Sequence, residues 1–130
     1  MCRISIKAKP AYVAAESDPS KKRFVWSYEM TILNDSEHIV QLLNRRWLIT
    51  DMSGRMEEIE GLGVVGMQPL IKPGKKFVYL SYCQLLTPQG TMEGSYEMQD
   101  LEEQHFNVEI PKFVLSAPVS VTKLFKSRLH

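Results

Sequence analysis

The chain has 130 residues, 44% of them hydrophobic and 24% charged, and its formal net charge is +1 at pH 7. This length corresponds to about one domain with room for a sizeable core. The near-zero charge provides no global field for nucleic acid or an acidic membrane surface. No hydrophobic run approaches the ~18–20 residues that a membrane helix needs, and the N-terminus lacks the apolar segment of a signal peptide. We therefore expect a cytoplasmic protein that binds neither nucleic acid nor a membrane.

The cysteines and the local charges refine this expectation. Cys2 and Cys83 are the only cysteines, and they have no metal-ligand spacing, so we expect reduced thiols rather than a disulfide framework. In residues 1–23 lysine and arginine outnumber the acids, six to two. Residues 91–109 carry six acids and no Lys or Arg, and no acid follows Glu109. Such runs are typical of solvated strand faces and a soluble tail, and a surface that faces a partner is the alternative.

The first half of the chain reads as strands separated by turns. Residues 4–8 alternate as a short strand that Pro10 is expected to end, and residues 10–22 read as a loop. From Phe24 to Ile32 every second residue is apolar, which predicts a long strand with one buried aromatic face that includes Trp26. Residues 39–51 are almost continuously apolar, as in a strand covered on both sides or bent by a bulge. Residues 55–60 predict a short, charged edge strand.

The second half continues the pattern. Strands are expected over residues 76–86, 91–99 and 106–110, the last of them closed by Pro111. After Pro118 the chain is a basic tail, in which Val121, Leu124, Phe125 and Leu129 suggest one or two amphipathic turns that dock loosely or fray. We therefore divide the chain into a β-domain, residues 1–117, and a C-terminal tail, residues 118–130.

About seven strands with turns every eight to twelve residues predict an all-β, antiparallel β-sandwich of immunoglobulin or fibronectin type III kind. The Cys–Trp–Cys arrangement of antibody domains is absent, because Cys2 precedes the first strand. A closed barrel is the alternative architecture, because periodicity does not separate the two.

One motif suggests a ligand. Gly61, Gly63 and Gly66 have the spacing of the dinucleotide-binding fingerprint, whose glycines open a helix that faces a pyrophosphate. Here Pro69 and a second proline four residues later forbid that helix. What survives is a phosphate-binding nest of backbone N–H groups in a loop, with Lys72 or the lysines after it nearby. The alternative, which we favour, is that the glycines supply positive φ where the chain crosses between strands.

The sequence shows no clear pattern of metal ligands or catalytic residues. His38, His105 and His130 show no ligand spacing, so we expect no metal site and no cofactor. Cys83 and His105 have the residue types of a nucleophile and its base, but nothing in the sequence indicates that they lie close together. We therefore expect a protein that is not an enzyme.

Several blocks of the chain occur together in the bacterial ApaG family, and this chain resembles that family from about Ile4 to Phe113. The blocks are Leu42–Asp51, the GLGVVG stretch at residues 61–66, Gln68–Leu70, Lys72–Gly74 and Thr87–Met98. The resemblance implies a fibronectin type III-like sandwich, a link to cobalt and magnesium tolerance, and a suggested phosphate-binding role for the glycine loop. ApaG-like domains also occur as modules in eukaryotic proteins such as an F-box protein, which implies a protein-binding role.

Two positions depart from the family pattern. Arg46 stands where the family usually has His before the tryptophan, and Tyr82 stands where a small Gly is common before the cysteine. Our leading hypothesis is a small, non-catalytic, cytoplasmic module that binds an unknown protein partner, with a homodimer left open. The link to cobalt and magnesium would then be indirect. The alternatives are a phosphate or nucleotide site, for example for pyrophosphate, at Gly61, Gly63, Gly66 and Lys72, and a divalent-metal sensor.

Overall fold

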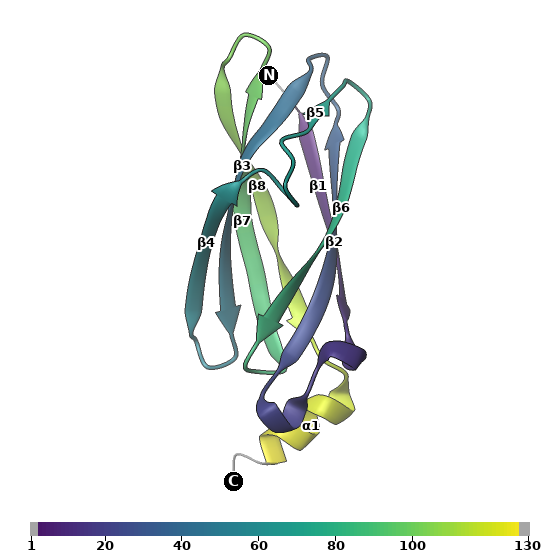
Figure 1. Ribbon diagram of the computed structural model, residues 1–130, viewed down its shortest axis with the longest axis vertical. Coiled ribbons are helices and arrows are strands. Elements are labelled where there is room, and N and C mark those ends of the chain that lie inside the picture. Colours follow the sequence, from purple (N-terminus) through teal and green to yellow (C-terminus); the bar gives the residue numbers. More distant parts are fainter. Residues whose placement is uncertain (1–2, 128–130) are drawn as a thin grey trace.

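The computed structural model describes residues 3–127 and forms two β-sheets that pack face to face (Figure 1). It contains eight strands: β1 (Ile4–Tyr12), β2 (Phe24–Asn34), β3 (Val40–Asp51), β4 (Met56–Leu62), β5 (Leu70–Ile71), β6 (Lys76–Leu85), β7 (Gln89–Asp100) and β8 (His105–Ser116). Two short 3₁₀ helices, η1 (Ala14–Glu16) and η2 (Pro19–Lys21), lie in the segment that we expected to be a loop. One α-helix, α1 (Val119–Ser127), follows the last strand.

The strand order confirms the sandwich. One sheet has the order β1-β2-β6, the other has the order β4-β3-β7-β8, and the short β5 pairs with β3. All of these pairs are antiparallel. The two sheets are separate, so the closed barrel is wrong. The finer assignment to the immunoglobulin or fibronectin type III kind stays a prediction, as does the division of the chain at residue 117.

The core lies between the sheets, where the alternating residues meet. Trp26 is 1% exposed and Trp47 is 2% exposed, which confirms the strand facing expected from the sequence. The ring centroids of Trp47 and Tyr28 are 5.5 Å apart at an interplanar angle of 71°, an edge-to-face contact between the two sheets. Burial of such aromatic side chains supplies a large share of the stability of a small domain.

The expectation that Pro10 ends the first strand is wrong, because β1 continues to Tyr12. Strand β1 is an edge strand, and Pro10 lies opposite Tyr28. The N–H of Asn34 donates to Lys75 (3.0 Å), so alternate residues of β2, among them Tyr28, direct their hydrogen bonds to β6. The nitrogen of Pro10 therefore faces away from β2, where a strand does not need a donor.

Pro111 does not close β8 either. The register between β7 and β8 shifts at this point, so that Pro111 and Lys112 together lie opposite Glu93. Strand β8 is also an edge strand, and a proline is tolerated in a bulge on an edge. The strand therefore runs on to Ser116.

Two expectations for the middle of the chain are confirmed. Strand β3 has a bulge between Leu42 and Asn44, which leaves Leu43 as the extra residue. Strand β4 lies at a sheet edge, as its charged sequence indicated. The sequence analysis missed β5, because its two residues are too few to show an alternating pattern.

The basic tail contains the amphipathic turns that the sequence suggested, within helix α1. Helix α1 has nine residues, Val121 packs against the core, and Thr122 is 8% exposed, so the helix docks on the domain. The expected roles of the Phe125 side chain, Leu129, His130 and Cys2 fall outside the described side chains. Within residues 3–127 no helix has the length and apolar character that crossing a membrane requires.

Candidate functional site

The glycine motif lies where β4 ends and the chain crosses toward β5 (Figure 1). Gly61 is still part of β4 and pairs with Arg45, so this glycine is not in a loop as we expected. Gly63 and Gly66 follow the strand and have φ angles of +60° and +79°. The positive φ that we favoured as an explanation is therefore confirmed for two of the three glycines.

The motif contains a two-residue hairpin turn at Val65 and Gly66. The N–H of Val64 donates to the carbonyl of Met67 (2.8 Å), and the N–H of Met67 donates back to Val64 (2.9 Å). Val65 has a φ of 42°, so both central residues have positive φ, as in a type I′ turn. Val64 is completely buried and fixes the base of this turn in the core.

At Gly61 and at Gly63 a side chain would clash with a neighbouring group, and the group differs between the two positions. A Cβ on Gly63 would lie 2.0 Å from the carbonyl oxygen of Met67, so the turn leaves no room for a side chain. A Cβ on Gly61 would lie 2.8 Å from the guanidinium of Arg45, which passes directly over this residue. The guanidinium donates through Nη1 to the carbonyls of Leu62 and Gly63, at 3.0 Å each. Arg45 therefore holds the start of the crossing segment in place.

The bulge of β3 fixes the rest of the segment. The carbonyl of Leu43, the extra residue of the bulge, accepts hydrogen bonds from the N–H of Gly63 (2.7 Å) and from Nε2 of Gln68 (2.9 Å). The N–H of Leu42 donates to the carbonyl of Pro69 (3.0 Å). The amides of Gly63, Val64 and Met67 thus already donate to backbone carbonyls.

The structure does not bring Lys72 to the turn. Lys72 follows β5, which pairs with Val40 and Gln41, whereas Gly63 is held beside Leu43. At the rise of a β-strand, this places Lys72 roughly 13 Å further along the sheet. Among residues 3–127 no hydrogen bond or ion pair connects the Lys72 side chain to the glycine segment. The phosphate site at Gly61, Gly63, Gly66 and Lys72 stays a prediction.

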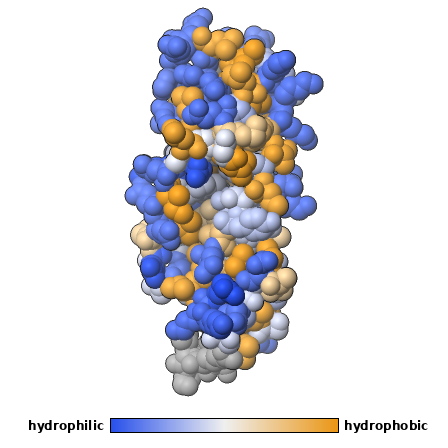
Figure 2. Space-filling model, in the orientation of Figure 1, coloured by the Kyte–Doolittle hydropathy of each residue, from blue (hydrophilic) through white to orange (hydrophobic). Residues whose placement is uncertain are grey.

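Four exposed apolar side chains on this segment were missed by the sequence analysis. They have exposed fractions of 75% for Leu62, 54% for Val65, 53% for Met67 and 61% for Leu70. We name residues 62–70 the apolar loop. Figure 2, in the orientation of Figure 1, shows hydrophobic residues among hydrophilic ones on the face that carries it. The signal was present in the sequence, because turns are rarely so apolar, but the glycine spacing dominated the interpretation.

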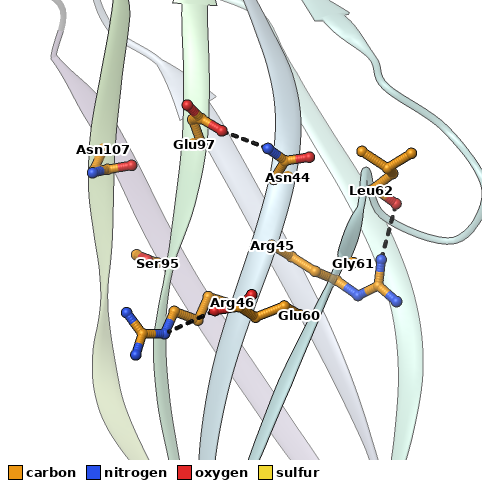
Figure 3. Close-up of a pocket in the computed structure, with 9 residues that line it drawn as sticks. All are labelled: Asn44, Arg45, Arg46, Glu60, Gly61, Leu62, Ser95, Glu97 and Asn107. Atoms are coloured by element: carbon orange, nitrogen blue, oxygen red, sulfur yellow. Dashed lines mark hydrogen bonds and ion pairs between the residues drawn. The ribbon is translucent and has the colours of Figure 1, made fainter.

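An open cavity of about 580 Å³ lies beside the apolar loop, on the outer face of the sheet that contains β3, β4 and β7 (Figure 3). Figure 3 shows neighbouring arginines pointing to opposite sides, with Arg45 directed toward Leu62 and Arg46 directed away from it. Arg46 donates through Nε to Glu58 (2.7 Å) and lies 3.5 Å from Glu60, so carboxylates neutralise its charge. These two glutamates raise the pKa of Arg46, with Glu58 the larger cause.

The other end of this cavity is also internally paired. Glu97 accepts hydrogen bonds from His105 (3.0 Å) and from the amide of Asn44. The hydrogen bond from His105, and then that from Asn44, lower the pKa of the Glu97 carboxyl. The lining therefore offers a mixed polar surface on which the charges already have partners.

A second cavity, of about 710 Å³, brings together residues that looked unrelated in the sequence. His38 and His105 both line it, together with Asp100 and Glu102. Among the described residues no group of three or more His, Cys, Asp or Glu side chains has a geometry that could hold a metal ion. The divalent-metal sensor therefore stays a prediction.

The candidate nucleophile and base lie in different sheets. Cys83 is in β6, with its thiol in the core, and burial, with a smaller contribution from Glu57, raises its pKa to about 11. His105 begins β8 and is exposed beside Glu97. A neutral, buried thiol is a weak nucleophile. Core tyrosines are also kept neutral: the hydroxyls of Tyr79 and Tyr96 lie 2.6 Å apart, and burial raises both of their pKa values.

Comparison with known proteins relates this geometry to a family. A family model for the ApaG domain (DUF525) matches residues 14–100. Protein ApaG of Mesorhizobium japonicum is 47% identical over 115 residues, which is 88% of each chain. Protein ApaG of Aromatoleum aromaticum is 44% identical over 116 residues, covering 89% of this chain and 91% of the relative.

Solved structures agree with this relationship. The putative ApaA protein from Bordetella pertussis is 42% identical, with a TM-score of 0.88 over 91% of this chain and 96% of that chain. A protein from Archaeoglobus fulgidus has a TM-score of 0.53 at 7% identity, which shows a likeness of fold alone. Because the family model covers more than half of the chain and the relatives match most of it, this chain belongs to the ApaG family.

Proposed function

We propose that this protein is a small, non-catalytic module that binds a protein partner through the apolar loop, residues 62–70. One observation carries the proposal: four large apolar side chains are exposed on a segment that backbone and side-chain hydrogen bonds hold in one conformation. Exposed apolar patches with polar surroundings are typical of protein interfaces. A loop that is already ordered loses little conformational entropy on binding.

The surroundings of the loop support the same function. Side chains such as Leu62 and Met67 can bury apolar area in a partner, while the neighbouring cavity offers polar groups, among them Asn44 and Ser95, for a rim. The paired charges of Arg46 and Glu97 need no external ion. As part of the same proposal, the link to cobalt and magnesium tolerance acts through the partner, and the protein works in the cytoplasm, where its cysteines stay reduced.

The phosphate alternative has less support. A nest needs free N–H groups that converge on the anion, whereas the amides of Gly63, Val64 and Met67 already donate to carbonyls. Of the arginines at the cavity, Arg46 lies between two carboxylates, and Arg45 already donates to the carbonyls of Leu62 and Gly63. We therefore rank a protein ligand above pyrophosphate or a nucleotide.

The test compares proteins captured from the source cell by the full chain and by loop variants. Leu62→Ser combined with Met67→Ser should abolish capture of a specific partner, because these side chains are exposed and contribute little to the core. The matched control is Met56→Ser, which removes a side chain that is 62% exposed on the same strand but outside the loop. An identical set of captured proteins for all three chains would contradict the proposal.

A further inference from the structure

The two sheets have four free edges, and three of them carry features that prevent pairing with another strand. Charged side chains and prolines on an edge strand are the usual protection against such pairing. The protecting residues are Lys7, Lys9 and Pro10 on β1, Glu57, Glu58 and Glu60 on β4, and Glu109, Pro111 and Lys112 on β8. Strand β8 also carries a bulge at Pro111.

The fourth edge, β6, lacks this protection. It is ten residues long, and from Phe77 to its end at Leu85 it contains no charged residue and no proline. Within residues 3–127 it pairs with β2 alone, as Figure 1 shows. Its outward side chains are apolar and exposed, at 47% for Val78, 48% for Leu80 and 60% for Tyr82. A long, apolar edge without charges or prolines is a template for an additional strand.

The backbone groups of these same residues face the free edge. The bond from the N–H of Asn34 to the carbonyl of Lys75 sets the alternation of the β2–β6 pair. The N–H of Val13 donates to the carbonyl of Val25, which confirms that the odd-numbered residues of β2 direct their hydrogen bonds to β1. The partners of those odd residues on β6 are therefore free to pair with a new strand, and they are Lys76, Val78, Leu80, Tyr82 and Gln84.

One end of β6 is positively charged. Lys72, Lys75 and Lys76 are exposed at its start, and within the described part of the chain none of them forms an ion pair. At the other end Asp51, Arg55 and Glu57 line a small cavity with Gln84, so two acids face one arginine there. A ligand strand along β6 therefore meets positive charge at the Lys76 end and negative charge at the opposite end.

We propose that β6 is a strand-addition site for an extended segment of the partner protein, which pairs antiparallel to β6 and ends in acidic residues. The segment carries apolar side chains at alternate positions, beside Val78, Leu80 and Tyr82, and its carboxylates follow them and meet the three lysines. Antiparallel pairing places the C-terminal end of the segment beside Lys76. The inference rests on the proposed function, because it specifies the chemical class of the partner.

A second copy of this chain does not fit as well. Antiparallel pairing of two β6 strands brings no carboxylate of β6 itself to Lys72, Lys75 or Lys76, because Phe77 to Leu85 contains none, and Glu57 belongs to β4 in the other sheet. Pairing of β6 with the β4 edge of another copy would place Glu58 and Glu60 beside apolar side chains, where their charges are poorly solvated.

The experiment screens a displayed library of random peptides on the full chain and measures binding of the enriched peptides in synthetic form. Enriched sequences should alternate apolar residues and end in aspartate or glutamate. Amide hydrogen exchange gives the structural readout. Without peptide, fast exchange is expected at Val78, Leu80 and Tyr82, and slower exchange at the residues bonded to β2, namely Tyr79, Ser81 and Cys83. Bound peptide should slow the first group.

Variants locate the site. Leu80→Glu should weaken peptide binding by about tenfold or more, because it places a charge on the edge. Val114→Glu is the matched control, since Val114 is 60% exposed on another edge strand. The pair Lys75→Glu and Lys76→Glu should weaken binding in a salt-dependent manner, whereas Lys7→Glu with Lys9→Glu, on the far strand of the same sheet, should not.

Several results would overturn the inference: no enriched peptides, enriched peptides without carboxylates, or peptides that bind Leu80→Glu as well as the unaltered chain. Protection of the β6 amides that rises with protein concentration alone would assign the edge to a second copy instead. If peptides fail while the loop variant still loses a captured partner, the strand-addition site is wrong and the proposed function stands. If the loop variant also captures an unchanged set of proteins, both are wrong.

Discussion

The outer faces of the two sheets use charge in opposite ways. The β4-β3-β7-β8 face carries three pairs of opposite charge, Arg46–Glu58, Glu97–His105 at 3.0 Å and Lys112–Glu93 at 3.4 Å. On the β1-β2-β6 face none of the described lysines forms an ion pair, and an apolar strip runs along β6. Exposed ion pairs add little stability, so the main effect of the first arrangement is to neutralise the face. The second face leaves both charge and apolar area available for recognition.

The largest expected effect tests the core that both faces share. Trp26→Ala and Trp47→Ala should each lower the free energy of unfolding by ~3–5 kcal/mol, because each indole is almost fully buried. Denaturant unfolding measures the loss. Tyr82→Ala is the control, since this ring is 60% exposed, and it should change the stability by less than about 0.5 kcal/mol. Free quenching of both indoles by acrylamide in the folded protein would refute the packing.

The next effect concerns the glycine segment, which connects β4 to β5 within one sheet. Gly63→Ala should destabilise by ~1–3 kcal/mol, because its Cβ would meet the carbonyl of Met67 in a backbone with positive φ. Gly66→Ala, whose Cβ meets nothing within 4 Å, should cost only about 1 kcal/mol. Calorimetry with pyrophosphate and ATP should show no saturable binding by the unaltered chain. Binding below ~100 µM, a free energy of roughly −5.5 kcal/mol, would restore the phosphate hypothesis.

Two adjacent arginines allow a direct comparison of an inward-facing and an outward-facing charge. Arg45→Met should destabilise by ~1–3 kcal/mol, because the carbonyls of Leu62 and Gly63 lose a charged donor. Arg46→Met should leave the free energy of unfolding nearly unchanged, since its ion pairs are exposed. Equal losses in urea unfolding would show that the two side chains do not differ as described.

The smallest effect is a pH dependence on the paired face. The lowered pKa of Glu97 means that its contribution is present above the ordinary glutamate value of 4.5 and is lost as pH falls through the lowered pKa. The stability difference between the unaltered chain and Glu97→Gln should therefore shrink on acidification from pH 7 to below that pKa. Urea unfolding at several pH values measures it. A difference that grows on acidification would contradict the assigned hydrogen bonds from His105 and Asn44.

The candidate site at the glycine segment was only partly predictable from the sequence. Positive φ at Gly63 and Gly66 followed from the two prolines, which rule out a helix after the motif. The role of Gly61 did not follow, because only the β3–β4 register reveals that Arg45 passes over it. The separation of Lys72 from the turn likewise depends on which part of β3 each segment contacts.

The sequence by itself determined what depends on local pattern. Alternation from Phe24 to Ile32 was sufficient to predict the burial of Trp26, because side chains of a strand point to opposite faces in turn. The charges of residues 55–60 already indicated one edge strand, but only the tertiary structure decided that β1, β6 and β8 also lie at edges. Pro10 continues a strand because its nitrogen faces away from β2, and the backbone groups of Leu80 are free because nothing pairs with the other side of β6 in residues 3–127. The physical reason is that hydrogen bonds between strands join residues far apart in the chain, so edge positions depend on pairing partners that local pattern does not encode.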